Sequence, residues 1–235
     1  MNKLSKKLIL GWLLLTGLTA TAQDTLNCPQ VLLETDMGNI RVALYNETPR
    51  HRDNFLALVK RGFYDGLLFH RVIPNFMIQT GDSLSRNAPT GKLLGDGHYE
   101  KYKLPAEIHY PQLFHKRGAL AAAREPDQTN PDKESSMCQF YIVYGRRFSN
   151  NMLDDVEERY ARDYKLMIDI PEEVREVYRT LGGSPHLDTQ YTVFGEVLEG
   201  IDVVRDIQNM ERDDNDRPLI DLHIIRATVV KDIPQ

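Results

Sequence analysis

The chain has 235 residues, of which 41% are hydrophobic and 27% are charged, and its formal net charge is −5 at pH 7. This composition supports an ordinary hydrophobic core and excludes a low-complexity or disordered chain. The chain has no basic patch of the kind that would indicate a nucleic-acid partner. The two cysteines are too few for a disulfide scaffold.

Residues 1–22 have the pattern of a secretory signal peptide. Three lysines precede the apolar run LILGWLLL, and ATA at 20–22 is an A-x-A cleavage site. The alternative, a membrane anchor, needs about 20 apolar residues, and this run is shorter and is interrupted by Gly11. Cleavage removes three lysines and no acidic residue, so 213 residues with a formal charge of −8 remain. We expect a secreted, periplasmic protein that does not contact the membrane after cleavage.

The first elements after a linker at 23–30 are a hairpin and a helix. In 31–45, two apolar runs flank the sequence DMGN, and apolar residues alternate with other residues in the second run, which predicts a β-hairpin. Thr48-Pro49 then has the form of a helix start, Phe55, Leu58 and Val59 share one helical face, and Gly62 ends the run. We expect a short helix here.

Many short strands follow, separated by Gly, Pro and Asp-rich turns. They are predicted at 67–73, 76–80, 118–123, 139–144, 191–198 and 222–230, and a second helix at 200–208. A chain rich in short strands favours a closed β-barrel, because closure removes exposed sheet edges. We therefore expect one mainly β domain over residues 31–231.

A helical insertion interrupts the strands at 149–183. Leu153, Val156, Tyr160, Tyr164 and Met167 form one apolar stripe at helical spacing. A second stripe runs from 174 to 181, and a Gly-Gly pair ends it. About 35 residues are too few for a separate domain, so the sequence predicts two helices attached to the barrel.

The cysteines and histidines give no clear site. Cys28 lies near the mature amino terminus and Cys138 in an apolar strand, so we favour two unpaired thiols over a disulfide. His98, His109 and His115 match no standard metal-ligand spacing. We expect no metal and no cofactor.

The segment FHRVIPNFMIQTGD at 69–82 is the most informative stretch. Side chains two apart on a strand face the same way, so Met77 and Gln79 share one face. The turn at Pro74-Asn75 would let Phe76 rotate onto that face. In a second strand, Gln139 and Tyr141 share a face in the same way.

Four segments together resemble a known family. FHRVIPNFMIQTGD, HKRGALAAAR at 115–124, CQFYIVYG at 138–145 and HLDTQYTVFGEVLEG at 186–200 are similar, in order and spacing, to the signature segments of the cyclophilin-type peptidyl-prolyl cis-trans isomerases. The resemblance covers residues 31–231, apart from the helical insertion. It implies an eight-stranded antiparallel closed β-barrel capped by two α-helices, with a proline-binding groove on its outer face and no cofactor.

The resemblance also implies the site residues. Arg71 would be the catalytic arginine, and Gln79 would hydrogen-bond the substrate and hold Arg71. Two residues, Ala123 and Arg124, would offer backbone groups to the peptide, and Gln139 would support the same wall, while His70 and Phe69 would brace the motif. The pocket for the proline ring would be lined by Phe76, Met77, Tyr141, Leu187 and Tyr191.

Three positions depart from the best-studied eukaryotic members. This chain has His186 where they have tryptophan, Arg124 where they have asparagine, and Tyr191 where they have histidine. Tyrosine at the last position is similar to bacterial members, and loss of the indole donor predicts weakened cyclosporin binding.

The expected function is isomerisation of X-Pro bonds in unfolded or flexible client proteins, by a monomer. A rival interpretation is a proline-peptide receptor or holdase without turnover. A second rival is a scaffold whose insertion carries the function, in which case the barrel merely folds. The barrel interpretation predicts that deletion of 149–183 retains isomerisation.

Overall fold

The protein is described here by a computed structural model covering residues 25–95 and 103–232. The proposed signal peptide at 1–22, the start of the linker and His98 lie outside these residues. Short 3-10 helices occur at Thr25–Asn27, Ser83–Ser85 and Pro185–Leu187. The other elements are β1 Gln30–Thr35, β2 Gly38–Leu44, α1 Pro49–Lys60, β3 Arg71–Ile73, β4 Met77–Thr80, β5 Lys103–Leu104, β6 Ala119–Ala122, β7 Ser135–Ser136, β8 Phe140–Val143, α2 Asn150–Asp163, α3 Glu172–Thr180, β9 Val193–Glu199, α4 Ile201–Gln208 and β10 Ile224–Lys231.

The predicted hairpin is confirmed as β1 and β2. Ile40, Val42 and Leu44 are all fully buried, as their alternation predicted. The turn closes through Thr35, whose Oγ1 donates to the Gly38 carbonyl at 2.6 Å. Gly38 has φ +127°, a left-handed conformation that glycine adopts without steric cost.

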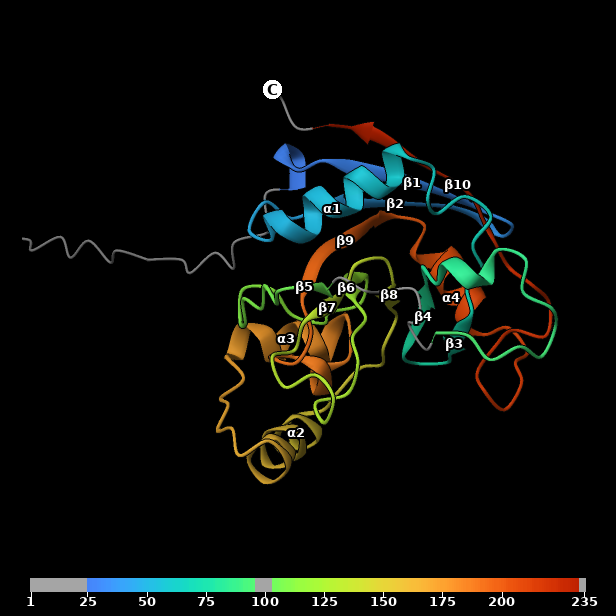
Figure 1. Cartoon of the computed structure of the whole chain (residues 1–235). Coiled ribbons are helices and arrows are strands. Elements are labelled where there is room, and N and C mark those ends of the chain that lie inside the picture. Colours follow the sequence, from blue (N-terminus) through green and yellow to red (C-terminus); the bar gives the residue numbers. More distant parts are fainter. Residues whose placement is uncertain (1–24, 96–102, 233–235) are drawn as a thin grey trace, which may run out of the picture.

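Eight strands form one antiparallel sheet in the order β10-β1-β2-β9-β6-β8-β4-β3, and β5 and β7 form a separate pair that the sequence did not predict. The sheet curves strongly (Figure 1). The edge strands β10 and β3 are linked near their starts, where Phe69 N donates to Leu222 O at 2.9 Å and Ile224 N to Leu67 O at 2.8 Å. The described chain therefore has the expected mainly β fold with one eight-stranded antiparallel sheet. The sheet is strongly curved, and its two edges are joined over a short stretch rather than by a continuous ladder.

The strand predicted at 67–73 is confined to β3 for a local reason. The Leu68 amide donates to Ser85 Oγ at 3.1 Å, and the Leu68 carbonyl accepts from Thr80 Oγ1 at 2.8 Å. Side chains thus take the two backbone groups that a strand ladder would use. Leu68 retains a single bridge to His223.

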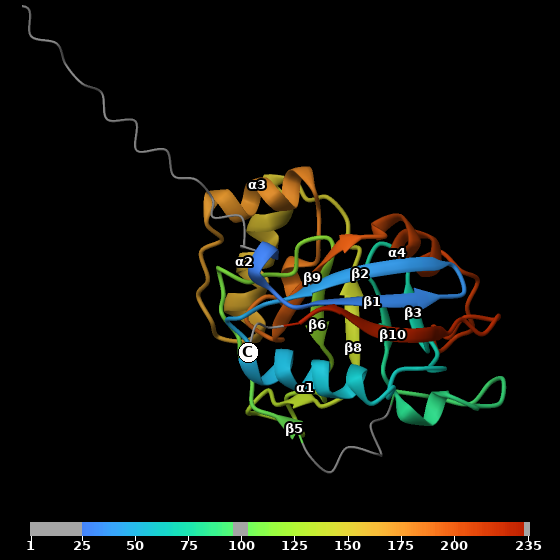
Figure 2. The same ribbon diagram turned by 90° about the horizontal axis from the view of Figure 1, so that it is seen from above.

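Both predicted capping helices are present. The concave side of the sheet holds the main core, into which α1 inserts Phe55, Leu58 and Val59, and α4 inserts Val204 and Ile207. Each of these side chains is less than 5% exposed. Figure 2 shows α1 and α4 well apart, on different sides of the curved sheet.

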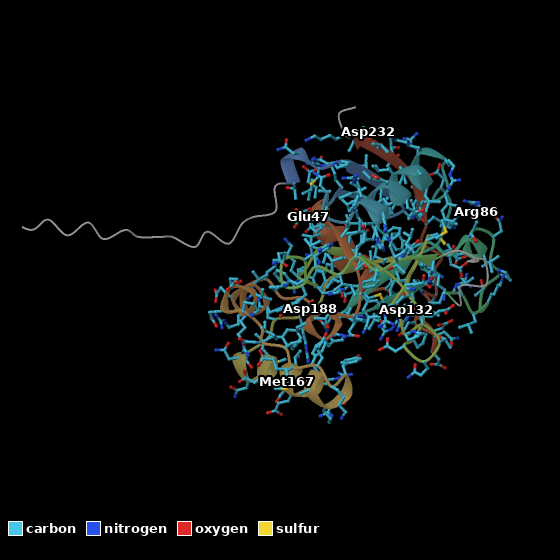
Figure 3. The ribbon with its side chains drawn as sticks, turned by 60° about the vertical axis from the view of Figure 1, so that its left-hand side comes forward. Glu47, Arg86, Asp132, Met167, Asp188 and Asp232 are labelled. Atoms are coloured by element: carbon cyan, nitrogen blue, oxygen red, sulfur yellow. The ribbon has the colours of Figure 1, made fainter. Side chains whose placement is uncertain are left out.

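The predicted insertion forms α2 and α3, which lie together on one side of the molecule, away from α1 and α4 (Figures 1 and 2). Leu153, Val156 and Tyr160 are buried in a small separate core. Tyr164 and Met167, which the stripe also included, are exposed, because α2 ends at Asp163. Met167 lies at the tip of the insertion (Figure 3) and is 85% exposed.

The two ends of the insertion meet at one point on the sheet. Gly183 N donates to Arg146 O at 2.9 Å, and Arg146 N to Gly183 O at 3.2 Å. A Cβ on Gly183 would lie 2.2 Å from the His115 carbonyl, so no other residue fits without a shift. This close junction lets the chain leave and re-enter the sheet without disturbing it.

Cys28 and Cys138 are two separate buried thiols and are not joined by a disulfide. In the described residues, no helix has both the length and the apolar character that a membrane crossing requires.

Candidate active site

A cavity of about 260 Å³ opens on the outer face of the sheet. Residues from β3, β4, β8, the segment after β6 and the segment before β9 meet there. We call it the outer-face cavity, and it is lined by His70, Arg71, Phe76, Met77, Gln79, Leu94, Gly95, Ala123, Arg124, Tyr141, Leu187 and Tyr191.

The cavity thus contains nine of the ten predicted site residues. The tenth, Gln139, lies in an adjoining cleft of about 200 Å³ that shares the Ala123 and Arg124 wall. The segments that supply these side chains are up to 120 positions apart in sequence, from Arg71 to Tyr191.

The hairpin of β3 and β4 orients the first group. Arg71 pairs with Gln79 and Ile73 with Met77 across this hairpin. Asn75 has φ +58° at the turn, and Phe76 N donates to Ile73 O at 3.1 Å. The predicted rotation is confirmed, because Phe76 packs with Met77 while Ile78 lies in the main core. We call the apolar cluster that contains Met77 the outer cluster; its buried members are Tyr45, Met77, Leu113, Ala119, Ala121, Tyr141, Val143 and Val193.

Strand β8 extends the same surface. Tyr141 pairs with Gln79 across the β4–β8 ladder and packs in the outer cluster. Its neighbours Phe140 and Ile142 lie in the main core. The two-residue period of a strand therefore separates site residues from core residues here.

The far wall comes from the 3-10 helix at Pro185–Leu187 and the residues after it. Leu187 and Tyr191 pack against the outer cluster, and the Tyr191 and Tyr141 rings meet edge to face with centroids 5.9 Å apart. The Arg124 guanidinium stacks 4.6 Å from the Tyr191 ring centroid, and its Nε donates to the Gln190 carbonyl at 2.7 Å. The Arg124 side chain is therefore anchored as part of the wall.

Arg71 presents its cation at the rim of the cavity. Its side chain is 42% exposed, and its Nε lies 3.5 Å from Asp216 Oδ2. Gln79 lies directly across the ladder from Arg71, but its amide donates to Gln139 Oε1 at 3.3 Å. Gln79 thus holds Gln139 rather than Arg71 as expected, and Asp216 is the ionic partner of the Arg71 side chain that lines the cavity.

His70, Leu94 and Gly95 also line the cavity, although the sequence interpretation gave His70 only a bracing role. His70 is 3% exposed, and burial lowers the pKa of its imidazole to about 4, partly offset by the nearby Asp82 carboxylate. Gly95 lies against this ring, since a Cβ there would be 3.0 Å from His70 Nε2. Neither Leu94 nor Gly95 carries a sequence signal that predicts this contact.

A buried polar network behind the cavity was also missed. Asp188 Oδ1 accepts from the His115 amide and lies 2.9 Å from His115 Nδ1, and His115 Nε2 lies 3.0 Å from the Tyr141 hydroxyl. Tyr178 of α3 donates to Asp188 Oδ2 at 2.6 Å, and Tyr160 of α2 donates to the Asp188 carbonyl. Asp188 lies where the insertion meets the sheet (Figure 3).

The acid–base properties of this network follow from burial. Desolvation raises the pKa of the Tyr141 and Tyr178 hydroxyls well above its ordinary value, so both remain neutral donors or acceptors. Over residues 25–95 and 103–232, no group of three or more His, Cys, Asp or Glu side chains is arranged to hold a metal ion.

Comparison with known proteins agrees with this geometry. Residues 30–229 match the model of the family described as cyclophilin type peptidyl-prolyl cis-trans isomerase/CLD. The chain belongs to the cyclophilin-type peptidyl-prolyl cis-trans isomerases. This match spans the insertion and all of the sheet except the last two residues of β10.

Two bacterial relatives are named for the same isomerase activity. A protein of Staphylococcus aureus (strain USA300) named as a peptidyl-prolyl cis-trans isomerase is 30% identical over 210 residues, covering 84% of this chain and 95% of its own. A relative of the same name from Staphylococcus epidermidis is 31% identical over 196 residues, covering 83% and 88%.

Solved structures show the same fold. A crystal structure of a Cryptosporidium parvum cyclophilin-type isomerase has a TM-score of 0.61 at 23% identity, covering 87% of this cyclophilin and 99% of its own chain. A second structure of that protein, in the presence of the dipeptide Ala-Pro, has a TM-score of 0.59 at 22% identity, covering 86% and 99%.

Proposed function

We propose that this cyclophilin accelerates rotation of X-Pro peptide bonds in unfolded or flexible protein clients, with Arg71 as the catalytic residue. The observation that carries the proposal is the position of Arg71, whose half-exposed guanidinium lines a cavity with an apolar wall of Phe76, Met77 and Leu187. The relative crystallised in the presence of Ala-Pro supports a proline-containing substrate.

The chemistry requires no covalent step. Rotation about an X-Pro bond is slow because amide resonance must be lost, at a cost of about 18–20 kcal/mol. In the twisted state the proline nitrogen becomes pyramidal and gains a lone pair. A cationic donor beside that nitrogen stabilises the twisted state more than either planar state, and this difference is what accelerates the rotation.

The residues around Arg71 are suited to hold the proline ring and the peptide backbone. The apolar wall holds the proline ring still while the preceding carbonyl rotates, and Gln79 and the backbone of Ala123 and Arg124 offer hydrogen bonds to the peptide. A rate increase of about 10⁵-fold would need about 7 kcal/mol. One preorganised donor supplies about 3–4 kcal/mol of this, and positioning by the cavity supplies the rest.

Arg71→Ala tests the proposal. We expect kcat/KM for an X-Pro peptide, measured by exchange NMR, to fall about 10²- to 10³-fold. Peptide affinity should change little, because the apolar wall is intact. Arg226→Ala is a matched control, since Arg226 is also a strand arginine paired with a carboxylate, that of Glu34. Exchange that is equal in Arg71→Ala and wild type, with binding retained, would instead support the receptor or holdase interpretation.

The cellular context is also a proposal. The lysine-flanked apolar run and the ATA sequence at 20–22 support secretion to the periplasm, and a formal charge of −8 after cleavage favours a soluble monomer. At the position of the tryptophan, His186 lies against Phe76 with ring centroids 5.3 Å apart. Since imidazole replaces the indole donor, we propose weakened cyclosporin binding.

A further inference from the structure

A second cleft, which we call the insertion cleft, lies between the β3–β4 turn and helix α2 of the insertion. Its volume is about 430 Å³, within the range of about 300–1,000 Å³ that ligand sites occupy. Pro74 and Phe76 form its wall on the sheet side, and Met152 and Val156 form its wall on α2.

The insertion cleft adjoins the outer-face cavity. Phe76 lines both, and the Phe76 ring lies against the His186 ring of the insertion cleft, with centroids 5.3 Å apart. One aromatic side chain therefore separates the two spaces. Since an extended chain advances about 3.3–3.6 Å per residue, a client with its proline in the outer-face cavity reaches the cleft within one to three residues.

We propose that the insertion cleft binds the stretch of client chain beside the proline and prefers a large apolar side chain there. This inference rests on the proposed function, because it uses the proline to place the client. It gives the helical insertion a role in substrate selection.

The walls suit an apolar side chain. Met152 is half-buried, and its unbranched thioether adapts to side chains of different shape. Pro74 and Phe76 are also partly exposed and present apolar surface opposite it. Burial of an apolar client side chain between these walls removes its surface from water, which is the main favourable term in such recognition.

The charges at the rim of the insertion cleft balance. Arg146 and Asp155 lie in the lining, and the second arginine there, Arg159, pairs with Asp163 at 3.3 Å. The rim therefore gives no preference for acidic or basic flanking residues, and selection depends on the apolar walls. Test peptides should carry constant, uncharged flanks.

The experiment uses the mature chain and three fluorescent peptides with a central Ala-Pro. One carries leucine two residues before the proline and serine two residues after it, the second reverses these positions, and the third has serine at both. Affinity is measured by anisotropy and X-Pro exchange by NMR. Each peptide is tested with wild type, Met152→Ala and the control Asn151→Ala, which alters the neighbouring exposed position of α2 outside the cleft lining.

One of the two leucine peptides should bind wild type about fivefold more tightly than the serine peptide. Met152→Ala should reduce that gain to less than about twofold, and Asn151→Ala should retain it. The serine peptide should bind and exchange equally in all three proteins. Equal binding of all peptides by wild type, or an undiminished leucine gain in Met152→Ala, overturns the proposal. If wild type binds a leucine peptide more tightly but accelerates X-Pro exchange in none of the peptides, the proposed catalysis is refuted. The assignment of the cleft as a binding site would still hold.

Discussion

Tyr141 uses its ring and its hydroxyl in different directions. The ring lines the outer-face cavity and meets Tyr191 edge to face. The hydroxyl points behind the cavity to His115 Nε2 at 3.0 Å. The proposed pocket needs the ring, whereas the fold needs the hydroxyl.

Tyr141→Phe should therefore separate stability from activity. Loss of the hydroxyl leaves His115 buried without this partner, which costs about 1–3 kcal/mol in the free energy of unfolding. X-Pro exchange should stay within about twofold of wild type, since the phenylalanine ring takes the place of the tyrosine ring in the cavity lining. Urea unfolding and exchange NMR measure the two effects, and Tyr144→Phe, at a half-buried position outside the cavity, is the control. A large loss of exchange with unchanged stability would assign the hydroxyl to the substrate.

His70 makes stability depend on pH. Burial lowers the pKa of its imidazole from 6.5 to about 4, so between these values the unfolded chain binds a proton that the folded chain does not. The free energy of unfolding should fall as pH decreases from about 6.5 to 4, by at most about 3 kcal/mol from this residue. Denaturant midpoints for wild type and His70→Gln across this range test the effect. The variant should show a shallower slope, and identical slopes would contradict the argument.

The strand period made much of the site predictable residue by residue. It placed Met77 and Gln79 on one face of the first strand, and Tyr141 on one face of the second strand together with Gln139. The family resemblance then assigned their chemical roles. No sequence pattern indicated the role of Gly95 or the His115–Asp188 contact. Both depend on loops from distant parts of the chain, for which neither periodicity nor spacing exists.

At the scale of elements, the insertion is fixed to the site by hydroxyl groups. Tyr160 of α2 and Tyr178 of α3 both donate to Asp188, the residue after Leu187. The helical stripes predicted these tyrosines as packing residues, and Tyr160 and Tyr178 are indeed buried. A stripe shows which face is buried, but not which polar atom a buried hydroxyl meets.

Tyr178→Phe tests this attachment. The hydroxyl donates to a buried carboxylate at 2.6 Å, and loss of such a bond costs about 1.5–3 kcal/mol in the free energy of unfolding. Because Asp188 adjoins Leu187, KM for an X-Pro peptide should rise several-fold while kcat is unchanged. Tyr164→Phe, at an exposed position of the same insertion, should change neither. A fall in kcat at constant KM would show that the insertion acts on the twisted state itself.

At the scale of the molecule, the sheet and the insertion have separate cores and meet at the Arg146–Gly183 junction and at Asp188. The main core fills the concave side of the sheet, and the insertion has its own core around Leu153, Tyr160 and Tyr178. The strand content predicted the sheet well, but closure of the barrel depends on long-range backbone pairing at 66–69 and 222–224. The side chains of Ser85 and Thr80 bond the Leu68 amide and carbonyl, which a strand ladder would otherwise use. Strand propensity does not reveal that competition.

Replacement of residues 148–181 by two glycines tests the separation. Arg146 and Gly183 are already backbone partners, so the four-residue loop left between them has the length of an ordinary hairpin connection. The shortened chain should fold with reduced stability, because Asp188 loses the Tyr160 and Tyr178 bonds. It should still isomerise a short X-Pro peptide, with kcat/KM reduced about fivefold through KM by the loss of the support behind Leu187. Circular dichroism establishes the fold and exchange NMR the turnover. A folded variant with no turnover at all would mean that the insertion supplies a group that the reaction requires, and Arg71 beside an apolar wall would then not be a sufficient catalyst.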